Sequence, residues 1–129
     1  MADDIASDLP ADVESKLTAD YGDFAAVRTV LGFVAMRSAT KPEYNRFYAA
    51  SQKEGERAVA QEALAFKCVI YANGVYANPS DDKHGQDEVR AALKVMLDKR
   101  PGMLSSLANC ALEASGVDGD AATKKYGAS

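Results

Sequence analysis

The sequence contains no tryptophan, one histidine and two cysteines, and only 8% of its residues are aromatic. Its four phenylalanines all fall within the first 66 residues. The hydrophobic fraction is 47%, but much of it is alanine, which favours helix and buries little area. A chain of 129 residues fits one domain. We therefore expect a single helical domain with a thin core, which a partner could complete.

The sequence also lacks an excess of basic charge and lacks long apolar runs. Its 15 basic and 19 acidic residues give a net charge of −4, and the basic residues are scattered among acidic ones. Nucleic-acid binding usually needs a basic face that releases counterions from phosphates. No window approaches the roughly 20 apolar residues of a membrane span, and Met1-Ala2-Asp3-Asp4 has no apolar stretch behind it. We expect a cytoplasmic protein that binds neither nucleic acid nor membrane.

Groups that carry out catalysis or bind metal are sparse. Cys68 and Cys110 each lie in an apolar helical pattern, which favours core packing over a disulfide or a reactive thiolate. His84 stands beside Asp81-Asp82, where it could act as a base or bind a metal, although a solvated loop histidine is the simpler interpretation. No cysteine or histidine spacing matches a zinc site, and the acidic pairs lack the alternating ligands of a calcium loop. We predict no catalytic residue, no metal site and no cofactor.

The first half of the chain predicts a helix, a hairpin and a second helix. Pro10 to Asp20 has apolar residues at four-residue spacing and ends at Gly22. Residues 24–38 are rich in β-formers, which predicts two short strands joined by a tight turn at Gly32. Thr40-Lys41-Pro42-Glu43 has the pattern of a capping box and predicts a helix over about 41–51.

The second half predicts three helices separated by a loop. Val59, Ala63, Phe66 and Ile70 form one stripe of a helix over about 54–71, which Asn73-Gly74 ends. Residues 73–86 are expected to form a long loop, followed by helices over about 87–99 and 103–115 with a break at Arg100-Pro101-Gly102.

The predicted fold class is α+β and predominantly helical, with an N-terminal β-hairpin packed against four to five α-helices. The predicted organisation is an acidic N-terminal segment with a short helix (1–20), a single globular domain (21–117) and a flexible tail (118–129).

Several short motifs occur in an informative order. They are Pro42-Glu43-Tyr44-Asn45-Arg46-Phe47, Lys67-Cys68-Val69-Ile70-Tyr71, Arg100-Pro101-Gly102, and Leu107-Ala108-Asn109 followed by 111–116. This order resembles that of the small tail assembly chaperones of long-tailed bacteriophages, over roughly Tyr21 to Gly116. The chain departs from that pattern in two places, since no proline follows Tyr71 and the loop at 72–86 is longer.

The resemblance implies a non-enzymatic role. Such a chaperone binds the long helical tape measure protein, keeps it soluble and helps tail-tube subunits assemble around it. The resemblance also implies residence in the cytoplasm of the infected host and absence from the mature virion. A frameshift-extended second form occurs in many relatives, and Lys124-Lys125 could be encoded by a slippery run.

A chaperone for a helical client needs apolar surface that it does not bury itself. The candidate partner-binding residues are Tyr44, Tyr48, Tyr71, Tyr76, Leu104 and Leu107. Plain core packing is the alternative for each of them. Two other functions remain open: a structural virion protein such as a head–tail connector or tail-completion protein, and an enzyme that gathers His84 with Asp81, Asp82 or Glu88.

Overall fold

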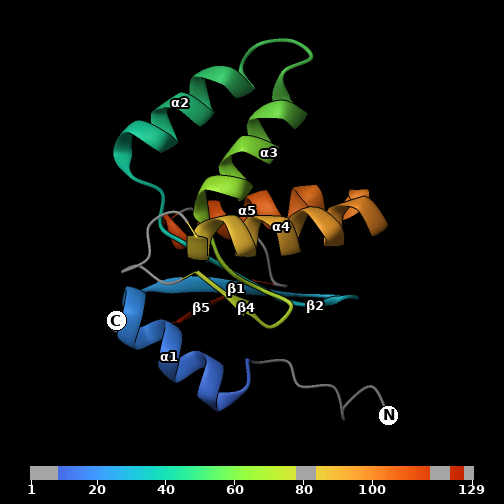
Figure 1. Cartoon of the computed structure of the whole chain (residues 1–129). Helices are drawn as coiled ribbons and strands as arrows, with labels where there is room; N and C mark the ends of the chain where they lie inside the picture. The colour runs from blue at the N-terminus through green and yellow to red at the C-terminus, as the bar shows by residue number, and fades with distance from the viewer. Residues whose placement is uncertain (1–8, 78–83, 117–122, 127–129) are drawn as a thin grey trace.

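A sheet with helices on both faces forms the body of the protein (Figure 1). The computed structural model describes residues 9–77, 84–116 and 123–126. Within these ranges the sheet has five antiparallel strands in the order β4-β3-β2-β1-β5. The strands are β1 (Phe24–Thr29), β2 (Gly32–Arg37), β3 (Val69–Ala72), β4 (Val75–Tyr76) and β5 (Thr123–Tyr126). The helices are α1 (Ala11–Tyr21), α2 (Lys41–Ser51), α3 (Arg57–Cys68), α4 (His84–Lys99) and α5 (Leu104–Ala114), with a 3-10 turn, η2 (Pro101–Met103).

The helices divide between the two sides of the sheet and a projecting pair. Helix α1 covers one face, and α4 and α5 cover the other (Figure 1). Helices α2 and α3 rise from the α4 and α5 side and point away from the sheet. We call residues 41–68, which contain α2, α3 and their connection, the α2–α3 arm. The sheet together with α1, α4 and α5 is called the body.

The predicted N-terminal hairpin is confirmed as β1 and β2. Thr29 pairs with Gly32, so Val30 and Leu31 form the turn. The Thr29 hydroxyl accepts a hydrogen bond from the Leu31 amide at 3.1 Å and donates one to the Gly32 carbonyl at 2.6 Å. Gly32 begins β2 at a φ of 126°, a value that L-residues rarely adopt, which explains glycine at this position.

A second hairpin replaces the predicted end of the helix over 54–71. Helix α3 ends at Cys68, and residues 69–71 belong to strand β3. Asn73 and Gly74 both have positive φ, 47° and 91°, and join β3 to β4 as a two-residue turn. Asn-Gly favours this turn because both central residues must adopt positive φ. Valine, isoleucine and tyrosine at 69–71 favour a strand, and here they are buried within the sheet.

The predicted loop at 73–86 is also shorter than expected. It contains β4, and α4 begins at His84 rather than at residue 87. Residues 78–83 lie outside the described ranges. The helices predicted over 41–51 and 103–115 correspond closely to α2 and α5, and Pro101 opens the 3-10 turn between α4 and α5.

One hydrophobic core joins both faces of the sheet. On the α1 side it includes Leu9, Val13 and Leu17, and on the other side it includes Leu93 and Leu107. Helix α1 is therefore part of the same globular unit as the sheet, although the sequence predicted a separate segment over 1–20.

The flexible tail predicted over 118–129 does not hold for residues 123–126. These residues form β5, which pairs with β1 from Val27↔Thr123 to Phe24↔Tyr126. Strand β1 has a second hydrogen-bonding edge that β2 does not use, and β5 occupies it. The remaining tail positions lie outside the described ranges.

The predicted fold class, α+β and predominantly helical with an N-terminal hairpin, is confirmed by these elements. Among the residues that the structure describes, no helix combines the length and the apolar character needed to cross a membrane.

Candidate functional site

A groove lies between the two helices of the α2–α3 arm. It encloses about 190 Å³ and is lined by apolar side chains with charged residues among them: Glu43, Arg46, Phe47, Ala50, Glu56, Val59, Ala60, Ala63, Leu64 and Lys67. Val59 is 64% exposed, whereas Ala60 and Leu64 form the buried floor. No side chain of α2, which the structure describes throughout, is buried. The arm therefore presents an open apolar surface on the monomer.

The spacing of the lining residues follows the helical period. On α2 they fall at 43, 46, 47 and 50, and on α3 and the residue before it at 56, 59, 60, 63, 64 and 67. Steps of three and four residues keep side chains on one face of a helix. Each helix thus contributes a continuous stripe to the groove, and two such stripes form the kind of seam against which a further helix packs.

The capping box predicted at the start of α2 is present and sets where the arm begins. The Glu43 amide donates to the Thr40 hydroxyl at 3.3 Å, and the Thr40 amide donates to the Glu43 carboxylate at 2.9 Å. Pro42 lies in the first turn, where its missing N–H costs no hydrogen bond. In the connection to α3, Gly55 has a φ of 78°, which favours glycine.

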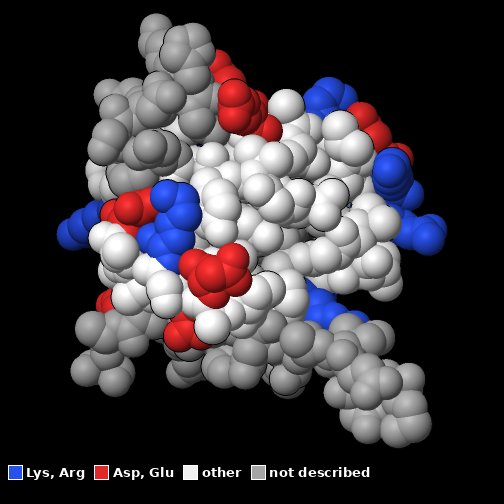
Figure 2. Space-filling view, turned by 60° about the horizontal axis from the view of Figure 1, so that its bottom comes forward, with Lys and Arg blue, Asp and Glu red and all other residues white. Residues whose placement is uncertain are grey.

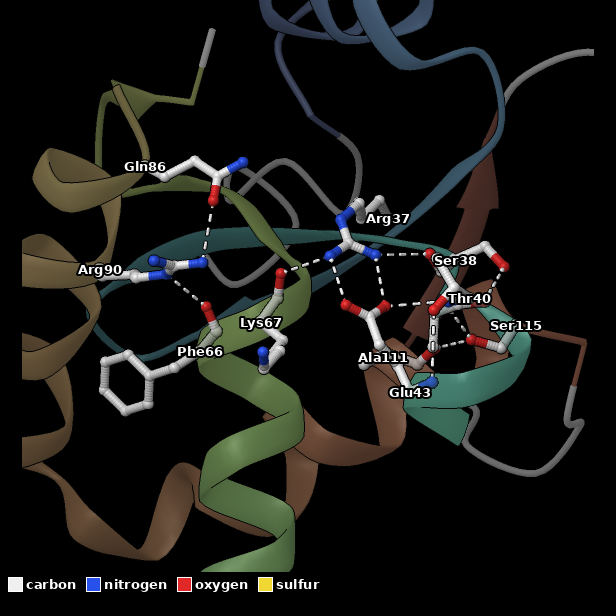
Figure 3. Close-up of polar contacts among 11 residues, drawn as sticks. Arg37, Ser38, Thr40, Glu43, Phe66, Lys67, Gln86, Arg90, Ala111 and Ser115 are labelled. Atoms are coloured by element: carbon white, nitrogen blue, oxygen red, sulfur yellow. Dashed lines mark hydrogen bonds and ion pairs between the residues drawn. The ribbon is translucent and has the colours of Figure 1, made fainter. Parts of the chain in front are cut away.

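Glu43 also anchors the arm to the sheet through Arg37, the last residue of β2 (Figure 3). The Arg37 guanidinium donates to both carboxylate oxygens of Glu43, at 2.9 and 3.1 Å. It donates further to the carbonyls of Lys67 at 2.8 Å and of Ser38 at 3.0 Å. The hydrogen bonds from Arg37 lower the pKa of Glu43 to about 2, so the carboxylate stays ionised at neutral pH.

A second arginine holds the end of α3 from the side of α4. The Nε of Arg90 donates a hydrogen bond to the Phe66 carbonyl at 2.8 Å, and its Nη2 donates one to the side-chain oxygen of Gln86 at 2.9 Å (Figure 3). The last carbonyls of a helix have no partner within that helix, and positive charge near them is favourable. Arg90 and Arg37 therefore fix the base of α3 while its upper part stands free of the body.

The start of α2 is tied to α5 by a serine. The Ala39 amide donates to the Ser115 hydroxyl at 2.8 Å, and that hydroxyl donates to the Ala111 carbonyl at 2.8 Å (Figure 3). The polar contacts of the arm with the body thus gather at its base, and apolar side chains line the middle of the groove above them.

The structure does not bring the six sequence-predicted candidates together. Tyr44 and Tyr48 lie on α2, and Tyr48 is 57% exposed, but neither lines the groove. Tyr71 and Tyr76 pair across β3 and β4 with ring centroids 5.0 Å apart. These four tyrosines therefore lie at two separate places in the fold.

The remaining two candidates lie on α5. Leu107 is fully buried in the core, and Leu104 packs partly against that core. Leu107 is therefore not accessible to a partner in this structure.

The sequence places part of the groove lining on a helical stripe but does not mark it as a binding site. Val59 and Ala63 belong to the stripe of the helix predicted over about 54–71. Their three- and four-residue spacing was visible in the sequence, but spacing alone does not say whether a stripe is covered. The groove becomes visible only once α2 is placed beside α3.

The reactive groups considered in the sequence are dispersed. Cys68 and Cys110 are buried in the core, and burial raises the pKa of the Cys68 thiol to about 11. His84 is the first residue of α4, not a loop residue. In the described part of the chain, no group of three histidine, cysteine or acidic side chains is placed to hold a metal ion.

Charged side chains on the α1 side of the molecule are scattered over the surface. Figure 2 shows lysines and arginines in separate places near acidic residues, with uncharged atoms between them. No continuous basic area appears on the described part of this face.

Comparisons with family models, curated proteins and solved structures found no match to this chain.

Proposed function

We propose that this chain is a non-enzymatic tail assembly chaperone of a long-tailed bacteriophage, which binds a helical segment of the tape measure protein in the α2–α3 groove. Binding keeps the tape measure protein soluble and promotes assembly of the tail tube around it. The proposal unites the resemblance of the ordered sequence motifs with an open apolar groove on the monomer.

The observation that carries the proposal is the open groove between the two helices of the arm, whose middle is lined by apolar side chains from both helices. Val59 is 64% exposed, and Phe47 and Ala50 on the opposite wall are only partly covered. Apolar side chains along such stripes lose contact with water when an amphipathic helix lies between them, and burial of one valine contributes about 1.5–3 kcal/mol. A long helical client that would otherwise aggregate presents suitable segments.

The electrostatics of the chain favour a protein partner over nucleic acid. The net charge is −4, and the two cationic lining residues of the groove, Arg46 and Lys67, stand beside Glu43 and Glu56, so the lining offers no series of phosphate contacts. The raised pKa of the Cys68 thiol, about 11, makes it a poor nucleophile at neutral pH. Both points favour a binding role without catalysis.

The proposal extends to the place and timing of action. The chaperone would act in the cytoplasm of the infected host and be absent from the mature virion, with the tail-tube protein as a second partner. A frameshift at the codons for Lys124-Lys125 would extend the chain directly from β5, at the edge of the sheet. The nucleotide sequence tests this extension, because it requires a slippery run and an overlapping reading frame there.

The test of function is co-expression with the tape measure protein encoded beside this chain. We expect the chain to keep the tape measure protein in the soluble fraction, and Val59→Glu to abolish that effect. A carboxylate in the groove costs more than the lost apolar contact, so binding should weaken at least about tenfold. Val95→Glu is the matched control, because Val95 is a 54% exposed valine on α4, outside the groove.

Two results would overturn this proposal. One is equal solubility of the tape measure protein without the chain, and the other is full activity of Val59→Glu. Mass spectrometry of purified virions separates the chaperone from a head–tail connector or tail-completion protein, since only the latter two would be present in stoichiometric amounts.

A further inference from the structure

The length of the groove matches that of a short helix. Its α3 stripe runs from Glu56 to Lys67, a length of about 17 Å at 1.5 Å per residue. A partner helix of about three turns would match this length. The open volume of about 190 Å³ is space that side chains of such a helix would fill.

The walls of the groove set the size of the partner's side chains. Ala50, Ala60 and Ala63 are small, and they leave space between the larger Phe47, Val59 and Leu64. Cores pack well when large side chains face small ones. The partner helix should therefore carry large aliphatic residues, such as leucine, along the stripe that faces the alanines.

The charged lining residues are distributed unevenly along the groove. Glu56 lies at the tip of the arm, where α3 begins, and Lys67 lies at the base, where α3 ends. Arg46 lies on α2 just under one turn above Glu43. Among the described residues, Arg46, Glu56 and Lys67 form no ion pair with each other or with a fourth residue.

Glu43 does not offset the positive charge of the basal half. Its carboxylate is held by the Arg37 guanidinium through two hydrogen bonds, so the pair has no net charge. Lys53 and Glu54 in the connection, and Arg57 next to Glu56, also lie at the tip but do not line the groove. Along its lining, the groove is therefore positive from its base to its middle and negative at its tip.

The backbone of the arm does not oppose this polarity. Helices α2 and α3 run in opposite directions, so their dipoles largely cancel along the groove. The direction of a third helix is then set by the charged side chains, together with its own dipole, which is positive at the amino end and negative at the carboxyl end.

Resting on the proposed function, we infer that the groove seats one amphipathic partner helix in a single direction, parallel to α3. The partner's acidic carboxyl-terminal turn meets Arg46 and Lys67, and its basic amino-terminal turn meets Glu56. Between the two turns, large aliphatic side chains face the alanines of the groove. The occupant is thus a helical segment with lysine or arginine first, an apolar stripe, and aspartate or glutamate last.

Two synthetic peptides of equal composition test the direction. The first carries two lysines in its first turn, a leucine stripe for three turns and two glutamates in its last turn. The second exchanges the lysines and glutamates. Fluorescence anisotropy with the full chain at low ionic strength should show the first peptide binding about fivefold more tightly, the scale of a few exposed ion pairs.

A charge-exchanged chain removes the influence of peptide helicity from this comparison. The variant Arg46→Glu, Glu56→Lys and Lys67→Glu changes exposed side chains and leaves the Lys67 carbonyl available to Arg37. It should reverse the preference and bind the second peptide more tightly. The matched control is Lys94→Glu with Asp98→Lys, which exchanges an exposed ion pair on α4 and should leave the preference unchanged.

The outcomes separate this inference from the proposed function. If both peptides bind equally to the original and to the charge-exchanged chain, the inferred direction of the partner helix is wrong. Binding of neither peptide, while Val59→Glu still abolishes solubilisation of the tape measure protein, also overturns the inference and leaves the function intact. If the preference reverses as expected but the chain has no effect on the solubility of the tape measure protein, the direction of helix binding is supported and the proposed function is overturned.

Discussion

The body buries most of its large apolar side chains, whereas in the α2–α3 arm no side chain of α2 is buried, and Tyr48 and Val59 are 57% and 64% exposed. In the body, Val30 at the hairpin turn and Val95 on α4 are isolated exceptions. The arm is tied to the body by polar contacts at its base, through Arg37, Arg90 and Ser115. The C-terminal half of α3 also contributes Leu64, Ala65 and Cys68 to the core. Stability therefore resides in the body and the base of the arm, and we expect the exposed side of the arm to offer its surface to a partner without weakening the fold.

The largest effect should come from truncating a phenylalanine in the body. Phe24 on β1 is 1% exposed, so Phe24→Ala should lower the free energy of unfolding by about 4 kcal/mol in urea titrations. Phe47→Ala in the arm should cost only about 1 kcal/mol, because Phe47 is partly exposed in the groove. Equal costs at the two positions would remove the distinction between body and arm.

A middle-sized effect is expected where the two regions join. Glu43→Gln preserves the shape of the capping box but removes the charge paired with Arg37. The drop in the pKa of Glu43 from 4.5 to about 2 corresponds to about 3 kcal/mol, which solvent screening reduces to about 2 kcal/mol. The variant should lose this amount at pH 7.

The same pair gives a pH dependence of defined sign. Folding lowers the pKa of Glu43, so its stabilisation is complete above about pH 4.5 and is lost as the pH falls toward 2. The difference in unfolding free energy between the original chain and Glu43→Gln should therefore shrink across this range. A constant difference from pH 7 to pH 2 would show that the charge contributes nothing.

The smallest effect on stability should come from the groove itself. Val59→Glu should change the free energy of unfolding by no more than about 0.5 kcal/mol, because the side chain is 64% exposed. Val95→Glu should behave in the same way in the body. A loss of more than about 2 kcal/mol for Val59→Glu would mean that the stripe is needed for folding rather than for binding.

Local signals in the sequence predicted part of this fold well. The capping box at Thr40 to Glu43 and the β-formers around Gly32 each specify a local structure through contacts between near neighbours. Residues 69–71 were misassigned because their helical spacing continued that of α3, and a short apolar run does not distinguish a helix from a buried strand. Strand β5 was missed because its pairing with β1 joins residues about 100 positions apart, which no local pattern records.

The groove was harder to predict than the fold. Val59 and Ala63 have the spacing of core residues, and they would be core residues if another helix covered them. Which stripe remains open depends on where α2, α3 and α5 lie in space, and that arrangement depends on contacts such as Arg37 with the Lys67 carbonyl. The sequence shows the stripes but not the absence of a cover.

Amide hydrogen exchange of the chain, alone and bound to the tape measure protein, tests the central claim most directly. In the free chain, we expect α2 to exchange faster than the buried strands β1 and β2, because its side chains are not buried. On binding, protection should rise at residues 43–50 and 56–67 and stay unchanged in α1 and the sheet. Protection confined to the body, with no change in the arm, would contradict the assignment of the α2–α3 groove as the partner-binding site.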